Sequence, residues 1–240
     1  MSLLRTEGLT RHFGGVAAVE DLSLAVEPGE IFGLIGPNCS GKTTALNLLS
    51  GFLDPDRGRA WLAGEEVTRM KPAALARRGL LRMFQMTRVF PRICAFDNLL
   101  TAGLARGLDE SESTRRASAL LEELTLAPVQ YLDAGALSGG QRKLLEFGMC
   151  FMEPPRVALL DEPFAAVHPV MRETMARFIR ARNAQGHTFL VVSHDMPIVV
   201  ELCGRAACMN AGRLIAVGAT RDVLKDAAVI EAYLGSGTHA

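Results

Sequence analysis

The stretch Gly36-Pro37-Asn38-Cys39-Ser40-Gly41-Lys42-Thr43-Thr44 decides the fold of this chain. It fits the pattern G-x-x-x-x-G-K-[ST], in which the backbone N–H groups of a glycine-rich turn point inward and form a concave anion site. The apolar run directly before it, residues 31–35, is typical of a buried strand. After it, Leu46, Leu49 and Gly51 predict an amphipathic helix that begins at Lys42 and ends at a glycine. Strand, loop and helix in this order favour phosphate binding at the positive N-terminal end of the helix.

The side chains of the loop indicate which phosphates it binds. We expect the ammonium group of Lys42 to reach the β- and γ-phosphates of a nucleoside triphosphate, and the Thr43 hydroxyl to ligate Mg²⁺. ATP and Mg²⁺ are therefore the predicted ligands. The loop residues expected to contact ATP are Gly36, Asn38, Cys39, Ser40, Gly41, Lys42, Thr43 and Thr44.

Cys39 is the unusual residue of this loop, because a glycine at its position reaches positive φ and approaches phosphate most freely. One interpretation is that the loop tolerates a small side chain there at a modest cost in strain. The other is weaker nucleotide binding, or a thiol whose modification switches the site off.

Composition narrows the class of protein. The 240 residues carry 26 basic and 26 acidic side chains, and this balance does not favour a nucleic-acid-binding protein. Hydrophobic residues make up 49% of the chain, yet no run of about 18 apolar residues predicts a membrane span. The N-terminal residues lack the apolar region of a signal peptide, so we expect a cytosolic protein. The 5 cysteines are scattered and odd in number, so we expect no disulfide framework and buried free thiols at all except Cys39.

Hydrophobic periodicity predicts a mixed α/β chain. Residues 3–30 alternate apolar and polar side chains, which predicts an antiparallel strand pair, and residues 59–67 predict a second hairpin. Residues of about 90–150 are mostly helical in preference. Strand-type runs at 157–160 and 188–192 flank another helix, and this alternation indicates a parallel sheet.

The predicted fold class is therefore α/β, a P-loop NTPase core with a mostly parallel sheet, an N-terminal antiparallel β-subdomain and a helical subdomain. We expect a single domain over residues 1–240. Its nucleotide-binding core is expected at about 1–89 and 151–240, and its helical subdomain at 90–150.

Two carboxylates follow the apolar strand at 157–160. Ligands collect at the carboxyl ends of strands in open α/β sheets. Asp161 suits a second Mg²⁺ contact through water, and Glu162 suits a general base that orients water for attack on the γ-phosphate. The alternative is a pair of loop acids that merely solvate the strand end.

Residues 137–141, Leu-Ser-Gly-Gly-Gln, predict a second anion-binding helix start. Ser138 is a good N-cap, and the two glycines open a backbone nest. One chain does not need two such sites for one γ-phosphate. They make sense if two copies meet head to tail, each closing over the nucleotide that the other holds. The residues expected to contact that nucleotide are Ser138, Gly139, Gly140 and Gln141.

The order of these motifs resembles that of the nucleotide-binding subunits of ATP-binding cassette transporters. The phosphate loop, Gln85, Leu-Ser-Gly-Gly-Gln, Leu-Leu-Asp-Glu-Pro and His194 span essentially the whole chain. The Leu-Ser-Gly-Gly-Gln string is highly specific for that family when it lies between the two other nucleotide motifs. Further stretches are similar to the branched-chain amino acid uptake group: Phe13-Gly14-Gly15, residues 31–38, Ser193-His194-Asp195-Met196 and residues 229–235.

This resemblance implies three further site residues. Phe13 stacks on adenine in this interpretation, whereas the alternative is a core aromatic of a sheet. Gln85 contacts Mg²⁺ or the attacking water and senses the γ-phosphate; its position alone distinguishes it from a solvated loop residue. His194 hydrogen-bonds the γ-phosphate and orients Glu162, although a lone histidine at a strand end is more often structural.

The resemblance also implies partners and a place of action. We expect a second nucleotide-binding subunit, identical or different, transmembrane permease subunits, and an indirect link to a solute-binding protein, but no nucleic acid. The chain then lies peripherally on the cytoplasmic face of the inner membrane. ATP-driven closure and reopening of the paired subunits power import of branched-chain or other amino acids. We expect residues 86–91 to form part of the permease dock, with core positions for Val89 and Phe90 as the alternative.

The chain departs from the family at three places. Glycine is usual at Cys39, a glycine followed by Asn or Asp is usual where Ala166-Val167-His168 stand, and an arginine is usual near Met149. These changes bear on interface geometry and hydrolysis rate more than on nucleotide binding, unless they are lineage drift. Cys39 and His168 motivate a second hypothesis, a degenerate regulatory cassette with weak hydrolysis. Cassettes for urea import, for lipid export, or for work on DNA or ribosomes are further alternatives.

Overall fold

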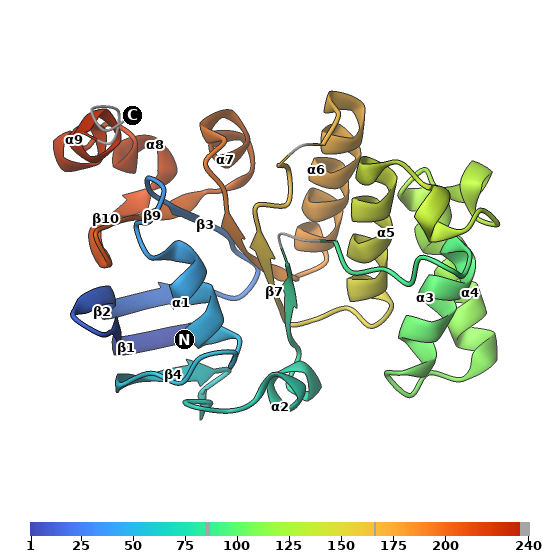
Figure 1. Ribbon diagram of the computed structural model, residues 1–240, viewed down its shortest axis with the longest axis horizontal. Coiled ribbons are helices and arrows are strands. Elements are labelled where there is room, and N and C mark those ends of the chain that lie inside the picture. Colours follow the sequence, from blue (N-terminus) through green and yellow to red (C-terminus); the bar gives the residue numbers. More distant parts are fainter. Residues whose placement is uncertain (85–86, 166, 236–240) are drawn as a thin grey trace.

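The structure is a computed structural model that describes residues 1–84, 87–165 and 167–235. Its strands form one four-stranded sheet in the order β2-β1-β4-β5 and one six-stranded sheet in the order β10-β9-β3-β8-β7-β6 (Figure 1). The strands are β1 (Leu4–Phe13), β2 (Val16–Val26), β3 (Ile31–Ile35), β4 (Arg57–Leu62), β5 (Glu65–Glu66), β6 (Leu80–Met83), β7 (Val157–Asp161), β8 (Thr188–Val192), β9 (Arg205–Asn210) and β10 (Arg213–Ala219).

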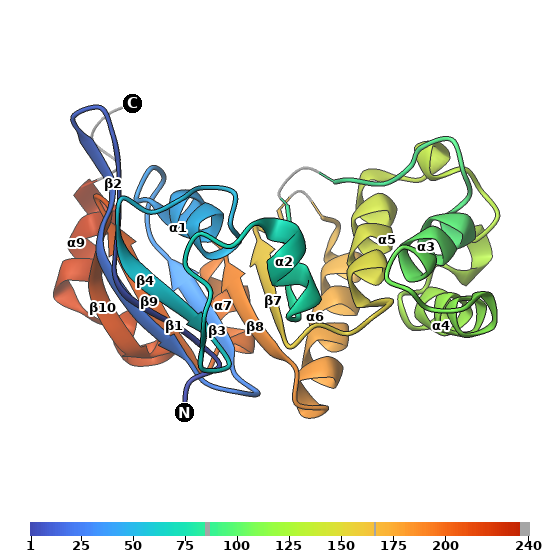
Figure 2. The ribbon, with the colours of Figure 1, turned by 90° about the horizontal axis from the view of Figure 1, so that it is seen from below.

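Some helices lie beside the sheets, and others form a separate group. They are α1 (Lys42–Leu49), α2 (Pro72–Arg77), α3 (Ala95–Leu104), α4 (Glu110–Glu123), α5 (Gly139–Phe151), α6 (Pro169–Ala184), α7 (Met196–Leu202), α8 (Thr220–Val223) and α9 (Ala227–Gly235). Helices α3, α4 and α5 gather at one end of the molecule, away from the four-stranded sheet (Figures 1 and 2).

The four-stranded sheet is antiparallel throughout. Strand β1 pairs with β2 on one side and with β4 on the other, and β4 pairs with β5. The strand pair predicted for residues 3–30 and the hairpin predicted for 59–67 are therefore confirmed. Alternate side chains of β2, among them Leu22, Leu24 and Val26, are buried, so one face of this sheet packs on the core.

The six-stranded sheet is parallel except at its edge. Strands β9, β3, β8, β7 and β6 run parallel, and only β10 is antiparallel to its neighbour β9. Every residue of β3, β7 and β8 is buried, which is why these strands are almost continuously apolar. Successive side chains point to opposite faces: Phe32 and Leu34 enter one core cluster, and Ile31 and Ile35 the other.

Aromatic side chains join the helical group to the sheet. The ring centroids of Phe147 and Phe151 on α5 and Phe178 on α6 lie 5.1 Å apart from one another, and Phe151 stacks on Phe189 of β8 at 5.9 Å. Burial of such rings contributes about 3–5 kcal/mol each on the scale of truncation to alanine. This packing fixes α5 against β8 and, through it, against the strand ends.

The cysteine prediction is only partly confirmed. Cys203 and Cys208 are buried and Cys39 is exposed, as expected, but Cys94 and Cys150 are only partly buried. Cys94 lies at the surface because it caps α3, where its sulfur accepts a hydrogen bond from the Asp97 N–H at 3.4 Å. Among the described residues, none of the helices has the length and apolar character needed to cross a membrane.

Candidate functional site

The phosphate loop connects β3 to α1, as predicted, and two of its glycines are required by close backbone contacts. Gly36 has φ +145°, and a Cβ there lies 2.2 Å from the Met209 carbonyl oxygen. Gly41 has φ +104°, and a Cβ there lies 2.4 Å from the carbonyl oxygen of Ala18. Neither position accepts a side chain without backbone movement. The loop is therefore clamped between β9 and β2, with its N–H groups at the start of α1.

Lys42 lies inside the loop at the first position of α1. Its ammonium group donates to the carbonyl oxygens of Gly36 (2.8 Å) and Pro37 (2.7 Å) and to the Ser40 hydroxyl (3.2 Å). Burial lowers the pKa of Lys42, while the charges of Glu162 and other nearby acidic groups oppose that shift. The ammonium is thus held where phosphate oxygens can replace the loop oxygens as acceptors.

A cavity of about 330 Å³ opens beside this loop. Its lining consists of Val16, Ala17, Ala18, Cys39, Ser40, Gly41, Lys42, Thr43, Thr44, Ala211 and Gly212. Asn38 is exposed and lies outside that lining. A larger cavity of about 490 Å³ lies elsewhere, around α2 and the Pro154–Arg156 segment, and none of the predicted site residues that the structure describes lines it. Chemistry, and not volume, identifies the smaller cavity as the candidate site.

Cys39 has the backbone conformation that the sequence suggested. Its φ is +62°, in the left-handed region that favours glycine, and its thiol is exposed and lines the cavity. A non-glycine residue there costs about 1–3 kcal/mol of strain. The loop tolerates this cost while keeping its fold, and the thiol faces the predicted ligand.

The C-terminal helix supports the loop from behind. The Gly36 N–H donates to the Tyr233 hydroxyl of α9 at 2.8 Å. Burial raises the pKa of Tyr233 to about 12, so the phenol stays protonated at neutral pH. Sequence patterns alone do not reveal this contact, because its partners lie 197 positions apart.

Asp161, at the end of β7, is held by a buried arginine. Arg82 of β6 donates to the Asp161 carboxylate at 2.8 Å, and the exposed fractions of the two side chains are 4% and 5%. The same guanidinium donates to Asn47 of α1 and to Ser50, the residue that caps the end of α1. Arg82 therefore ties the helix of the phosphate loop to the acidic strand end. Thr43 and Asp161 offer oxygen ligands of the kind that Mg²⁺ prefers.

Glu162 and His194 meet at the same edge of the sheet. The His194 Nδ1 lies 3.0 Å from the Glu162 carboxylate, and the exposed fractions of the two side chains are 65% and 14%. They meet because β7 and β8 pair in parallel with Asp161 opposite Val192, so the residues after each strand emerge together. The predicted pairing of His194 with Glu162 is thus present in the geometry.

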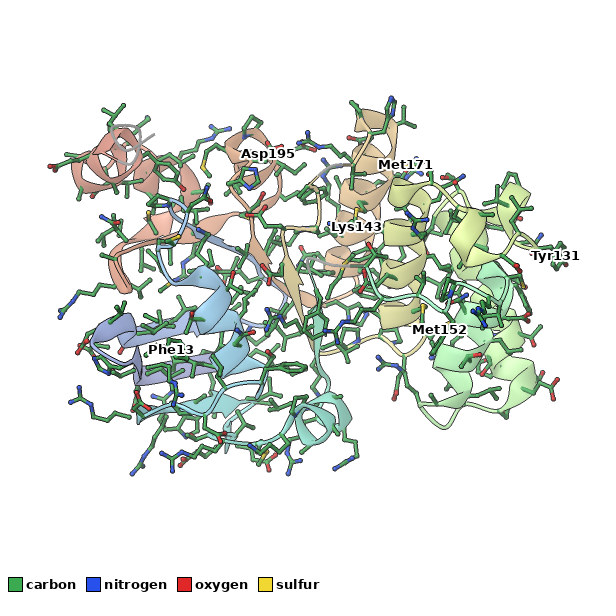
Figure 3. All side chains as sticks on the ribbon, in the orientation of Figure 1. Phe13, Tyr131, Lys143, Met152, Met171 and Asp195 are labelled. Carbon is green, nitrogen blue, oxygen red and sulfur yellow. The ribbon has the colours of Figure 1, made fainter. Side chains whose placement is uncertain are left out.

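The Leu-Ser-Gly-Gly-Gln segment begins α5 as expected. Ser138 is the N-cap in a full capping box: its hydroxyl accepts from the Gln141 N–H, and its own N–H donates to the Gln141 side chain. A Cβ at Gly140 lies 2.3 Å from the sulfur of Met171 on α6, whereas Gly139 is open (Figure 3 labels Met171). Figures 1 and 2 both place α5 on the far side of β7 from α1. The two helix starts that are predicted to bind anions therefore lie apart within one chain.

Of the two other predicted site residues, the structure describes Phe13 but not Gln85. Phe13 is exposed (47%) at the end of β1 and pairs with Val16, which lines the cavity, so the core interpretation was wrong (Figure 3). Gln85 lies outside the described residues, and so does Met86 of the predicted dock.

The described departures from the family have local structural roles. His168 caps α6, where its Nδ1 accepts from the Val170 N–H at 3.4 Å, and Val167 is buried. Met149 is partly buried and packs on the core around α5. Ala166 lies outside the described residues.

Most of the described residues of the predicted dock are exposed. Thr87 and Arg88 are exposed, and Phe90 shows 52% of its surface, whereas Val89 packs partly on the core. Phe90 is pinned through its backbone, which exchanges hydrogen bonds with the Asn98 side chain. The core alternative was therefore wrong for Phe90 and partly right for Val89.

Comparison with known proteins gives the family. The family model described as ABC transporter matches residues 19–165, and the one described as branched-chain amino acid ATP-binding cassette transporter matches residues 213–239. The chain belongs to the ABC transporter family of ATP-binding subunits. The predicted family resemblance, α/β P-loop fold class and ATPase activity are confirmed.

Relatives of this ABC ATPase match over nearly their whole length. A probable branched-chain amino acid transport ATP-binding protein of Methanocaldococcus jannaschii is 33% identical over 252 residues, with 98% of both chains covered. A high-affinity branched-chain amino acid transport ATP-binding protein of Pseudomonas aeruginosa is 35% identical, with 97% of this chain and 98% of the relative covered. A lipopolysaccharide export system ATP-binding protein of Acidithiobacillus ferridurans is 33% identical, with 97% of each covered.

Solved structures agree in fold with this ABC ATPase. The ADP conformation of an ATP-binding cassette of an ABC transporter superposes with a TM-score of 0.88 at 33% identity, covering 98% of this chain and 99% of that one. A nucleotide-free ATP-binding cassette gives a TM-score of 0.87 at 32% identity, covering 97% and 99%.

Removing Arg82 should leave the buried Asp161 carboxylate without its ion-pair partner. We expect Arg82→Met to lower the free energy of unfolding by about 3–5 kcal/mol in urea denaturation, because Asp161 then loses its buried partner. The double variant Arg82→Met/Asp161→Leu should recover most of that loss, since it removes both charges. Arg77→Met, at an exposed position, serves as the control and should change stability by less than about 0.5 kcal/mol. Equal losses in the single and double variants contradict this account of the ion pair.

Alkylation should test the role of Cys39. Because its thiol lines the cavity, we expect N-ethylmaleimide to block ATP binding in the native protein, and MgATP to slow that reaction. Cys39→Gly should bind ATP and be insensitive to the reagent, measured with a fluorescent ATP analogue. A protein that is fully alkylated at Cys39 yet binds ATP normally places the thiol outside the site.

Proposed function

We propose that this ABC ATPase powers the import of branched-chain or other amino acids, as a peripheral subunit on the cytoplasmic face of the inner membrane. The observation that carries the substrate class is the match of residues 213–239 to the branched-chain amino acid cassette family. The relatives named for branched-chain amino acid transport support the same class. Its partners are transmembrane permease subunits and, indirectly, a solute-binding protein.

ATP is held by the phosphate loop in this proposal. Backbone N–H groups and Lys42 bind the phosphates, Thr44 and Ser40 extend the polar lining, and Phe13 stacks on the adenine ring at the open side of the cavity. Thr43, Asp161 and Gln85 would hold Mg²⁺, which would neutralise charge on the β- and γ-phosphates.

Hydrolysis is assigned to the pair at the strand ends. Glu162 accepts a proton from the attacking water, and His194 orients the Glu162 carboxylate through their 3.0 Å contact while facing the γ-phosphate. Gln85 senses the γ-phosphate from the segment that leads to the dock. Most of the rate enhancement comes from positioning and from charge neutralisation around the phosphates.

Two such subunits, identical or different, form two composite sites. Ser138, Gly139, Gly140 and Gln141 of one subunit close over the nucleotide held by the phosphate loop of the other. The separation of α1 from α5 within one chain supports this arrangement (Figure 1). ATP binding closes the pair, and hydrolysis reopens it.

The chain functions as a single domain over residues 1–240 in this proposal. Its core at about 1–89 and 151–240 binds nucleotide, and its part at 90–150 carries the closing segment. The grouping of α3, α4 and α5 at one end supports this division.

An export role is the second candidate, favoured by the 33% identity to a lipopolysaccharide export ATP-binding protein. Reconstitution with the permease subunits separates the two: a leucine-loaded binding protein stimulates ATP turnover if the chain drives import, and lipopolysaccharide stimulates it if the chain drives export. A regulatory cassette with weak hydrolysis is less well supported, because Glu162 and His194 are paired at the site.

Glu162→Gln tests the assignment of the base. We expect it to lower the turnover of ATP by about 100-fold or more, since general base catalysis contributes roughly that factor. Its affinity for ATP should stay close to that of the wild type, because the amide keeps the shape of the side chain. Equal turnover in the two proteins removes Glu162 from the mechanism.

Phe90→Asp tests the dock. We expect assembled transporters carrying it to lose coupling between ATP hydrolysis and transport, because a charge replaces an exposed aromatic contact. Val217→Asp places the same charge at another exposed position (49%) and should leave uptake intact. Unchanged uptake by the Phe90 variant in proteoliposomes contradicts the dock.

A further inference from the structure

Glu162 is held in an unusual backbone conformation. Its φ is +49°, in the left-handed region that a β-carbon disfavours. Its N–H donates to the Val192 carbonyl oxygen at 2.9 Å, which fixes one side of the residue to β8. Its carbonyl oxygen accepts from the Ala165 N–H at 3.2 Å and from the Lys143 ammonium at 2.9 Å. Lys143 therefore completes the set of contacts that keeps the strained residue in place.

Lys143 is itself an unusual lysine. It lies on α5, only 6% exposed, and points its ammonium away from water toward the end of β7 (Figure 3). Burial lowers its pKa, and the negative charges of Glu146, Glu162 and Asp161 oppose that shift. A buried ammonium is costly unless it is paired and hydrogen-bonded. An aliphatic side chain at this position would pack α5 against the sheet without the cost of burying a charge. The retained ammonium of Lys143 therefore indicates a role beyond packing.

The same face of α5 reaches the segment that follows Gln85. Glu146, one turn after Lys143, is 5% exposed, and one of its carboxylate oxygens has no hydrogen-bond partner among the described residues. Burial raises the pKa of Glu146 to about 7, while a hydrogen bond from the Arg88 backbone and the charges of Lys143 and Arg88 oppose the shift. Glu146 and Arg88 also line one cavity of about 310 Å³. Helix α5 thus touches Glu162 through Lys143 and the dock through Glu146.

We propose that Lys143 is a positioning residue for Glu162: its ammonium holds the Glu162 carbonyl, and so fixes where the Glu162 carboxylate points when α5 is seated. This inference rests on the proposed role of Glu162 as the base. Because Ser138 caps the start of the same helix, any shift of α5 on closure moves the Lys143 ammonium relative to the Glu162 carbonyl. The catalytic carboxylate is aimed only when the helical part is in place.

The test compares Lys143→Met and Lys143→Arg with the wild type in steady-state ATP hydrolysis. We expect Lys143→Met to lower kcat by about 10–100-fold through misplacement of the carboxylate, with KM for ATP within about twofold. Lys143→Arg should restore much of the rate, since it keeps a cationic donor. Lys225→Met makes the same change at an exposed site and should leave both constants unchanged. Parallel changes in kcat and KM, or no rescue by arginine, overturn the proposal.

A double-mutant cycle separates this inference from the assignment of Glu162. In a Glu162→Gln background, Lys143→Met should lower the residual turnover by less than twofold, because the carboxylate that it positions is gone. Additive losses contradict the positioning role. If Glu162→Gln alone leaves turnover unchanged, the proposed base fails; if it abolishes turnover while Lys143→Met has no effect, only the present inference fails. Should Lys143→Met not fold, Lys143→Gln, which keeps a donor of shorter reach, takes its place in the cycle.

Discussion

The site depends on the parallel register of three buried strands. In β3, β8 and β7, Leu34 lies opposite Val192, and Val192 lies opposite Asp161. The phosphate loop, the segment with His194 and the acidic pair therefore leave the sheet at one edge, although they are far apart in the sequence. A shift of one residue in any of these strands turns its side chains to the other core cluster and moves its loop out of the site. The strand register therefore brings the side chains of three loops into one site.

Buried cations then hold the two acids from different elements. Arg82 reaches Asp161 from β6, and Lys143 reaches the Glu162 carbonyl from α5. Both are nearly enclosed, so neither contact is weakened by solvent as a surface pair is. The positions of Asp161 and Glu162 consequently depend on the packing of β6 and α5, and not on β7 alone. Since Ser138 caps the same helix, the proposed positioning of Glu162 and the proposed closure of two subunits both depend on α5.

Local sequence patterns predicted the local structure well. The strand, loop and helix around Lys42 follow from glycine chemistry and helix signals, and the cap at Ser138 follows from its residue type. The contacts of Arg82 and Lys143 did not follow, because an arginine in a strand and a lysine in an amphipathic helix look like solvated residues. Their partners lie 79 and 19 positions away, and only the folded sheet brings them together. Tyr233 was missed for the same reason, since its partner comes from the other end of the chain.

The central claim is that each nucleotide is enclosed by the phosphate loop of one subunit and the start of α5 of another. Crosslinking measures this directly, because Asn38 of the phosphate loop is exposed and lies outside the lining of the cavity. In an Asn38→Cys/Ser138→Cys variant with serine at Cys39, Cys94 and Cys150, a short bismaleimide should join two chains when ATP is bound and Glu162→Gln blocks its hydrolysis. The same protein with Asn38 restored should stay monomeric on a denaturing gel. Tight ATP binding without any crosslink between position 38 and position 138 of a second subunit contradicts the account.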